Sequence, residues 1–419
     1  MTILHLTLKS LNNRRGTAML TLFSIALSTA LLLGVERIRS EARNSFANTI
    51  SATDLVVGAR GGAMQLLLYS VFHIGNATNN ISWKSYQEII RHPKVSWTVP
   101  LALGDSHHGF RVLGTTSAFF EHYRYSGGRS LEFHSGHSFS DLYDAVIGAD
   151  VAEKLGYRLG QGMVVAHGAG KISIVQHADK PFRVVGILQR TGTPVDRTVL
   201  VSLEAIEAIH IDWQGGMPSP GVQITAEKTR EMNLTPRSIT AALVGLKSRV
   251  AVFQVQRFVN DYNEEALSAI MPGVALQELW DLMGIAENAL RIISWAVVLV
   301  GVTGMLNAIL SGLNERRREL AILRSVGARP WQISILLAGE AGTLSLVGAV
   351  SGMGLLHAAM FLLAPMVASR FGLSLGDGLP TTDEWQLLGL VVVAGVLVGI
   401  IPAWRAYRLS LADGMTIRI

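Results

Sequence analysis

The chain has 419 residues, of which 49% are hydrophobic and only 16% are charged. This charged share lies below the roughly 25% that is usual in soluble domains, which indicates membrane-spanning segments. The net charge of +5 does not indicate nucleic-acid binding, because the basic residues gather in short segments beside apolar runs. The absence of cysteine excludes disulfide bonds and thiolate metal ligands.

The first apolar segment, residues 17–35, follows a basic stretch and could be mistaken for a signal peptide. Its uncharged run is longer than the roughly 7–15 residues of a signal-peptide core, and no convincing cleavage site follows it. We therefore expect an uncleaved anchor. Three further segments are apolar over about 20 residues or more, which is the length that crosses a bilayer.

These segments divide the chain into alternating membrane and water-exposed parts. The expected parts are an amphipathic helix with the first span (1–35), an outer domain with a stalk (36–285), the second span (286–313), a short connection (314–332), the third span (333–367), an outer loop (368–384), the fourth span (385–404) and a tail (405–419). Lysine and arginine are concentrated in the two terminal segments and in the connection 314–332. The positive-inside rule therefore predicts that both termini and this connection are cytoplasmic, and that residues 36–285 lie outside.

The outer segment, about 250 residues long, alternates between strand and helix patterns. "KVSWTVPLAL" predicts a strand and "SWKSYQEIIRH" a helix, while "DAVIGADVAEKLGYRLGQGMVVA" predicts a strand, a helix that ends at Gly156, and another strand. "VQITAE" and "SITAALVGLK" predict further strands. The expected fold is an α-helical membrane protein with four transmembrane helices, plus a large mixed α/β domain between the first and second helices.

No motif for catalysis stands out in the chain. "HGAGKIS", residues 167–173, superficially resembles a phosphate-binding loop, but Val165 occupies the position of the first glycine and Ile172 that of the magnesium-binding serine or threonine. The metalloprotease pattern His-Glu-x-x-His does not occur. We therefore expect a protein that is not itself an enzyme.

The connection between the second and third spans, "NERRRELAILRSVGARPW", carries the densest charge in the chain. Asn314 can cap a helix, Gly327 suits the left-handed position after its end, and Pro330 can begin the next helix. Apolar residues repeat every three or four positions opposite the charged ones, which predicts a short amphipathic helix. Such a helix could anchor in anionic headgroups, but the mixture of both charge signs favours docking to a protein.

This connection resembles the coupling segment of the FtsX and MacB-type permeases of ABC transporters, in which an "ERRREIxxLRxxGA" stretch precedes the third span and contacts the ATPase. The resemblance extends over nearly the whole chain, including "SLNNRRGTAMLTLFSIALSTA" near the start and "IPAWRAYRLSLADGMTIR" at the end. It departs in the outer domain, around "LVVGARGGAMQLLLYSVFHIGNATNN", which leaves the substrate open. Carried over by position, the residues implied to couple to the ATPase are Glu315, Arg316, Arg317, Arg318, Glu319, Leu320, Leu323, Arg324 and Gly327.

The resemblance also implies partners and a mode of action. Such a permease sits in the inner membrane, pairs with a second copy or a paralogue, and works with two separate cytoplasmic ABC ATPase subunits that bind ATP and Mg²⁺. It transmits motion to its outer domain, which handles periplasmic cargo, an adaptor or a lipoprotein. The alternatives within the family are a transducer that activates a periplasmic hydrolase and a permease that extracts lipoproteins.

The third span carries two features of its own. Glu340 and His357 are its only ionisable residues, and too few for a polar conduit. Glu340 is expected to pair with a basic residue near the inner interface or to take part in coupling. Gly348 and Gly352 form a small-xxx-small pair that allows close helix approach, either within the bundle or between two copies.

A cluster of histidines in the outer domain raises the prospect of a metal site. Five histidines lie close together in sequence, at His107, His108, His122, His134 and His137. Asp105, Glu121, Glu132 and Asp141 lie nearby, and imidazole and carboxylate groups suffice to bind zinc in a tetrahedral set. The other interpretation is a solvated, histidine-rich loop. If the site exists, His134 and His137 are the first expected ligands.

Overall fold

The computed structural model describes residues 15–168, 177–214, 217–219, 224–315, 322, 324–371 and 379–408. The chain forms two compact units. One holds residues 1–42, 284–368 and 375–419, and the other holds 43–283 and 369–374. The first unit contains the membrane segments and the second is the outer domain.

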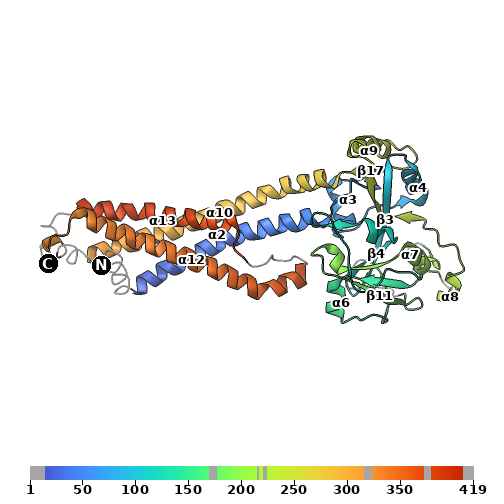
Figure 1. The fold of residues 1–419 in the computed structure, drawn as a ribbon, viewed down its shortest axis with the longest axis horizontal. Coiled ribbons are helices and arrows are strands. Elements are labelled where there is room, and N and C mark those ends of the chain that lie inside the picture. The colour runs from blue at the N-terminus through green and yellow to red at the C-terminus, as the bar shows by residue number, and fades with distance from the viewer. Residues whose placement is uncertain are drawn as a thin grey trace. The chain divides into compact units, whose positions relative to one another are not determined.

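Within the described residues, four helices are long and apolar enough to cross a membrane. They are α2 (Arg15–Thr49), α10 (Pro272–Glu315), α12 (Pro330–Phe371) and α13 (Thr382–Arg408). Figure 1 shows them as long ribbons, and one apolar core draws on all four, with Leu33 from α2, Met305 from α10, Leu344 from α12 and Val391 from α13. Many other large apolar side chains of these helices are exposed, as expected for surfaces that face lipid.

The two glycines of the third span lie where α12 meets α2 of the same chain. A Cβ atom added to Gly352 would lie 2.5 Å from the carbonyl oxygen of Ala26, and one added to Gly348 would lie 2.8 Å from Ile25. Only a hydrogen atom at these positions allows such close approach of two helices. The small-residue pair therefore serves a contact inside the bundle, which is the first of the two alternatives raised by the sequence.

The outer domain is built on a mixed sheet, which has eleven strands within the described residues. In spatial order its main path is β17 (Leu267–Ile270), β1 (Leu55–Ala59), β16 (Ala241–Leu246), β3 (Val95–His107), β4 (Phe110–Thr115), β12 (Thr198–Ser202), β8 (Asp144–Ile147), β11 (Phe182–Leu188) and β7 (Phe133–Gly136). Two short strands lie off this path, β10 (Ala166–His167) beside β3 and β9 (Gly162–Met163) beside β11. Among these described strands, only the β4–β12 and β8–β11 pairs are parallel.

Successive side chains of these strands point to opposite faces, and each face has its own core. Along β1, Val56 packs into one core, while its neighbours Leu55 and Val57 pack into another on the opposite face. Along β12, Leu200 joins the first core and Val199 a third. One face thus carries a continuous core, and the other carries two cores beneath different halves of the sheet.

Helices cover both faces of the sheet. They are α3 (Ala63–Ser70), α4 (Trp83–Arg91), α5 (Ala118–His122), α6 (Ala149–Leu155), α7 (Leu203–His210), α8 (Ala226–Thr229) and α9 (Val252–Asn260), with short 3₁₀ turns at Pro194–Arg197 and Arg249–Ala251. Ser82 and Ser202 cap α4 and α7 by accepting hydrogen bonds from backbone N–H groups. Gly156 follows α6 in the left-handed conformation, with φ of 68°, as the sequence predicts.

Three small ribbons complete the described part of the outer domain. They are β2 (Ile81–Ser82) with β15 (Ser238–Ile239), β5 (Arg124–Tyr125) with β6 (Arg129–Ser130), and β13 (Trp213–Gln214) with β14 (Met217–Pro218). The expected strand "VQITAE" is not seen in its described part, because residues 226 and 227 begin the short helix α8. Thr225 caps this helix, a role that favours a helix start over a strand.

Candidate functional site

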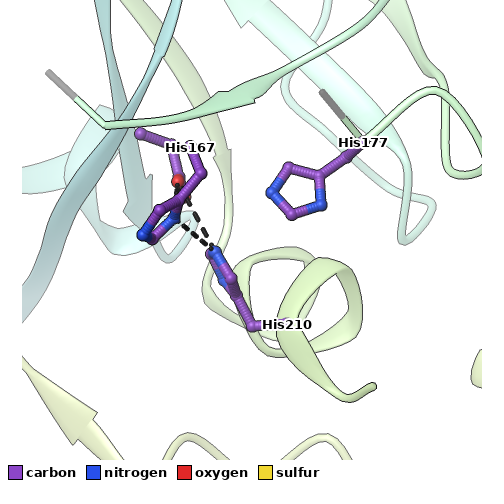
Figure 2. A group of neighbouring side chains, drawn as sticks. His167, His177 and His210 are labelled. Atoms are coloured by element: carbon purple, nitrogen blue, oxygen red, sulfur yellow. Dashed lines mark hydrogen bonds and ion pairs between the residues drawn. The ribbon is translucent and has the colours of Figure 1, made fainter. Parts of the chain in front are cut away.

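Four polar side chains from separate elements converge in the outer domain. They are Asp105, His167, His177 and His210, and each offers a potential ligand atom within 4.8 Å of the others. Figure 2 shows the three imidazole rings turned toward one another around the same point. Among the residues that the structure describes, this is the one group of three or more His, Asp or Glu side chains with the spacing of a metal site.

The position of Asp105 follows from an irregularity in β3. The pairing of β3 with β4 gains one extra residue on β3 between Leu103 and Ser106, which is a β-bulge. A bulge breaks the alternation of side chains and can re-aim one of them. Asp105 is buried together with the next residue, Ser106, and lies directly opposite His167 in the antiparallel pairing of β3 with β10. Nδ1 of His167 lies 3.1 Å from Oδ1 of Asp105.

His210 is the last residue of α7 and reaches the same point from the helix end. Its Nδ1 atom lies 2.9 Å from the carbonyl oxygen of Ile206, so Nδ1–H donates to this carbonyl and Nε2 is the nitrogen that faces the cluster. This Nε2 atom lies 3.1 Å from Nδ1 of His167 and 3.5 Å from Oδ1 of Asp105. The backbone carbonyl of α7 therefore fixes which nitrogen of His210 faces the cluster.

His177 comes from the segment that precedes β11, and a buried ion pair holds that segment. The fully buried Nζ of Lys180 donates to both carboxylate oxygens of Asp212, each at 3.0 Å. The backbone N–H of His177 also donates to the carbonyl of Val165 at 2.9 Å. Because Asp212 follows α7 by two residues, the ion pair joins the segment that carries His177 to the chain just beyond His210.

Burial and mutual contact shift the pKa values within the cluster. Burial alone would raise the pKa of Asp105, but hydrogen bonds from His167 and His210 outweigh it and lower this pKa to about 2. Burial lowers the pKa of His177 to about 4, with a contribution from the positive charge of His210. His210 has a raised pKa: burial acts to lower it, but the hydrogen bond and charge of Asp105 raise it by more. The cluster thus combines an ionised carboxylate with three imidazole rings, and these are groups that can bind a cation.

An indole ring packs against all three histidines. The ring centroid of Trp213 lies 5.0 Å from that of His167, 4.6 Å from that of His177 and 5.3 Å from that of His210. Trp213 thus limits access of water on its side, while His167 remains about 40% exposed and leaves an open approach. A single tryptophan so placed is also a built-in fluorescence reporter for the cluster.

The five histidines singled out from the sequence are not brought together in this way. Both ring nitrogens of His107 are engaged, by the carbonyl of Val164 at 2.6 Å and the hydroxyl of Tyr157 at 3.0 Å. His108 lies in the turn between β3 and β4. His122 stacks flat on Trp97, with ring centroids 4.7 Å apart.

His134 and His137 are exposed. His134 lies within β7 and His137 just beyond it, and Nδ1–H of His137 donates to the neighbouring carbonyl of Ser138. On a strand, residues three apart point to opposite faces, so this spacing does not make a pair of ligands. Of the groups named from the sequence, only Asp105 belongs to the cluster that the structure forms. His167, His177 and His210 carry no metal-binding motif. Strand pairing brings His167 to Asp105, while the end of α7 and the segment before β11 bring His210 and His177.

The expected coupling segment is described only in part. Residues 316–321 and 323 lie outside the described residues, so the placement of Arg316, Arg317, Arg318, Glu319, Leu320 and Leu323 is not part of the structure. Glu315 is the last residue of α10. Arg324 accepts a hydrogen bond from Gly327, which is left-handed with φ of 102°, and α12 then begins at Pro330.

Two apolar side chains of this segment are strongly exposed, Ile322 at 59% and Val326 at 83%. Exposed aliphatic side chains next to a run of charges suit a surface that another molecule covers. Glu340, the intramembrane acid of α12, is by contrast buried, at 5% exposure. Its expected role in pairing or coupling stays a prediction.

Family models match both units of the chain. The MacB-like periplasmic core domain matches residues 18–260, more than half of the chain, and the FtsX-like permease C-terminal domain matches residues 291–411. The chain belongs to the MacB/FtsX family of ABC transporter permeases. Membership makes it a multi-pass membrane protein with a periplasmic-type domain between its first and second spans, as the sequence predicts.

Relatives within this family are distant. An uncharacterized ABC transporter permease of Methanocaldococcus jannaschii is 21% identical over 68% of this chain and 72% of its own length. A pyoverdine export ATP-binding/permease protein of Pseudomonas entomophila is 27% identical over 77% of this chain and 45% of its own length. The chain thus spans just under half of that exporter. The crystal structure of the periplasmic region of MacB from Actinobacillus actinomycetemcomitans aligns with a TM-score of 0.33 and 11% identity, over 55% of this chain and 94% of that one.

Proposed function

We propose that this permease carries movement from a cytoplasmic ATPase to its outer domain. The ATPase would be a partner subunit present in two copies, and the permease would pair with a second copy of itself or with a paralogue. The observation that supports this proposal is the segment 314–332. It joins two spans of a family permease, combines both charge signs, and exposes Ile322 and Val326.

The membrane unit supports transmission of movement better than passage of a polar solute. Glu340 is buried, and the imidazole of His357 faces the buried carboxylate of Glu384 at 3.5 Å. These few ionisable groups lie buried or half-buried in the helix bundle, whereas a path for a polar solute would need more polar groups. The outer domain would therefore act on cargo in the periplasm. Export is the proposed direction, in line with the relatives named as pyoverdine exporters.

Charge reversal in the coupling segment tests the proposal directly. The full chain is purified in mild detergent with its co-expressed ATPase, as wild type and as the double variant Glu315→Lys, Glu319→Lys. We expect the variant to lose the bound ATPase or to lower permease-stimulated ATP hydrolysis roughly tenfold or more. Charge reversal brings like charges together at the interface, and such contacts cost several kcal/mol. Leu323→Asp should have the same effect, because it places a charge in the apolar side of the docking helix.

A matched control carries the same charge change on the other unit. Glu227→Lys with Glu231→Lys reverses two exposed glutamates of the outer domain and should leave ATPase association unchanged. Full ATPase stimulation in both coupling variants would contradict the docking role. Recovery of a periplasmic hydrolase with the wild-type complex would favour a regulatory transducer over an exporter.

A further inference from the structure

We propose that Asp105, His167, His177 and His210 bind one divalent transition-metal ion, with Zn²⁺ as the reference ion. This site goes beyond the proposed coupling role and does not depend on it. It also differs from the histidine cluster expected from the sequence, with which it shares only Asp105. The proposal rests on the geometry of the four donor atoms, on a buried imidazole without a partner, and on the contacts that hold the ligands in place.

The separations between donor atoms already approach those of a tetrahedral metal site. Zinc–nitrogen bonds of about 2.0–2.1 Å place neighbouring ligand atoms about 3.3 Å apart in a tetrahedron. Three separations here are 3.1, 3.1 and 3.5 Å, among Nδ1 of His167, Nε2 of His210 and Oδ1 of Asp105. The fourth ligand, His177, completes a set in which no two atoms lie more than 4.8 Å apart. Modest side-chain rotation would therefore close the set around an ion.

His177 supplies an independent indication of a ligand. Its side chain is 1% exposed, and its Nε2 atom has no hydrogen-bond partner among the described residues. A buried polar atom without a hydrogen-bond partner costs about 1–3 kcal/mol of stability. Such an atom therefore often indicates a bound ion or water molecule. Figure 2 shows the ring of His177 directed at the space between His167 and His210. A metal ion in that space would satisfy the free nitrogen.

The ligand residues also make contacts on the side away from the proposed ion, and these contacts are of the kind that metal ligands make. Metal-binding histidines usually donate their other N–H to a carbonyl or carboxylate, which fixes the tautomer. His210 does so through the carbonyl of Ile206. The buried pair of Lys180 with Asp212 fixes the segment of His177, and the β3–β10 pairing fixes Asp105 relative to His167. The four ligands, which come from β3, β10, the segment before β11 and α7, are therefore held in fixed positions around one point.

The donor set indicates the class of metal. Three imidazoles and one carboxylate suit Zn²⁺, Ni²⁺ or Cu²⁺, whereas Ca²⁺ and Mg²⁺ require six or more ligands that are mainly oxygen. Four protein ligands fill a tetrahedral shell and leave no position for a reactive water molecule. The site is therefore a structural or sensing site that clamps β3, β10 and α7 together. In the metal-free protein Nδ1 of His167 lies 3.1 Å from both Oδ1 of Asp105 and Nε2 of His210. A metal ion at Nδ1 requires the neutral tautomer of His167 that carries its proton on Nε2.

Metal titration of the full chain in detergent tests the site. The protein carries a purification tag without histidine and is stripped with EDTA before titration with Zn²⁺ by calorimetry. We expect one ion per chain with a Kd below about 1 µM. His177→Ala with His210→Ala should weaken binding roughly 100-fold or more, and Asp105→Asn, which keeps the side-chain shape, should weaken it at least tenfold. Binding by the wild type weaker than about 100 µM would overturn the proposal.

A matched control removes the same number of histidines elsewhere. His134→Ala with His137→Ala alters the exposed histidines of the β7 region and should leave the affinity unchanged. Circular dichroism and size-exclusion chromatography show whether each variant is folded. If the folded double variant at 177 and 210 binds Zn²⁺ as tightly as the wild type, the assignment of ligands is overturned.

Optical spectroscopy gives a second measurement that does not depend on the ligand variants. Co²⁺ replaces Zn²⁺ in tetrahedral sites and then absorbs strongly in the visible range, whereas six-coordinate Co²⁺ absorbs weakly. We expect the intense spectrum together with quenching of tryptophan emission. Trp213→Phe should retain the Co²⁺ spectrum and lose most of the quenching, because Trp213 contacts the ligands without being one. A weak six-coordinate spectrum would contradict the tetrahedral site.

Discussion

Arg37 of α2 and Glu384 of α13 form a buried ion pair, with Nη1 of Arg37 3.2 Å from Oε1 of Glu384. Their side chains are only 4% and 1% exposed. Nη1 also donates to the carbonyl of Leu379, and Glu384 accepts from the backbone N–H of Thr381. The hydroxyl of Thr381 in turn accepts from the N–H of Glu384, which forms a capping box at the start of α13. One glutamate thus joins two helices and starts one of them.

Neutralising this glutamate should destabilise the helix bundle. In Glu384→Gln the amide can still accept from Thr381, so the change removes charge while the cap remains. We expect a loss of about 2 kcal/mol in the free energy of unfolding, because the buried Arg37 would lose one of its two acidic partners and keep Glu41, which lies 3.1 Å away. The measurement is SDS titration in mixed micelles. As a control, Arg291→Gln breaks a partly exposed pair with Glu36 and should cost under about 1 kcal/mol; equal losses would argue against a special role for the buried pair.

Two glycines of α12 should respond to alanine in opposite directions. Alanine at Gly352 would place Cβ 2.5 Å from the carbonyl oxygen of Ala26, so the helices must separate at a cost of about 1–3 kcal/mol. A Cβ atom added to Gly354 would have no described atom within 4 Å, and alanine there should stabilise the helix by up to about 1 kcal/mol. Unfolding in mixed micelles measures both. Similar effects of the two variants would contradict the close contact between α2 and α12.

Much of this architecture could be predicted from the sequence, because the signals are local. Runs of apolar residues identify four membrane helices, and Gly156 marks the end of α6 in the outer domain. The pattern of strands and helices between the first two spans predicts the mixed α/β class. The strand expected at "VQITAE" shows the limit, because Thr225 caps a helix where the residues alone suggest β structure.

The histidine cluster could not be predicted, because its members meet only through long-range pairing. The sequence draws attention to histidines that are neighbours in the chain, yet His122 stacks on Trp97 and His107 uses both nitrogens in local hydrogen bonds. His167 and His177 reach Asp105 through a two-residue strand and a segment held by an ion pair. Neither feature has a sequence motif. The β-bulge that buries Asp105 is likewise set by tertiary pairing.

A half-buried histidine should make the stability of the outer domain depend on pH. Nδ1 of His73 lies 3.0 Å from the hydroxyl of Thr198, and burial, with the positive charge of Arg111, lowers the pKa of His73 to about 4. In the unfolded chain a histidine has a pKa of about 6.5. As pH falls from 6.5 toward 4, His73 binds a proton in the unfolded state but not in the folded state. The free energy of unfolding is therefore highest above pH 6.5 and decreases across this window.

Replacement of His73 should remove this part of the pH dependence. Its φ of 55° lies in the left-handed region, which asparagine tolerates well, so His73→Asn is the suitable variant. Between pH 7 and pH 5 we expect the wild type to lose roughly 2 kcal/mol more stability than His73→Asn. Urea unfolding of the detergent-solubilised chain, followed by tryptophan fluorescence, measures the difference. The exposed His134→Asn is the control, and an identical pH slope in all three proteins would refute the prediction.

Membrane orientation can be tested with single cysteines, because the chain contains none of its own. The arginine-rich connection 314–332 predicts that Arg318 is cytoplasmic, whereas Ser130 is exposed on the outer domain. In cells stripped of their outer envelope, Ser130→Cys should react with a membrane-impermeant maleimide and Arg318→Cys should react only after permeabilisation. A substitution that replaces one of several loop arginines should leave the positive-inside bias intact. Labelling at position 318 in sealed cells, with position 130 protected, would reverse the predicted orientation. The proposed docking segment would then lie on the side of the membrane away from a cytoplasmic ATPase.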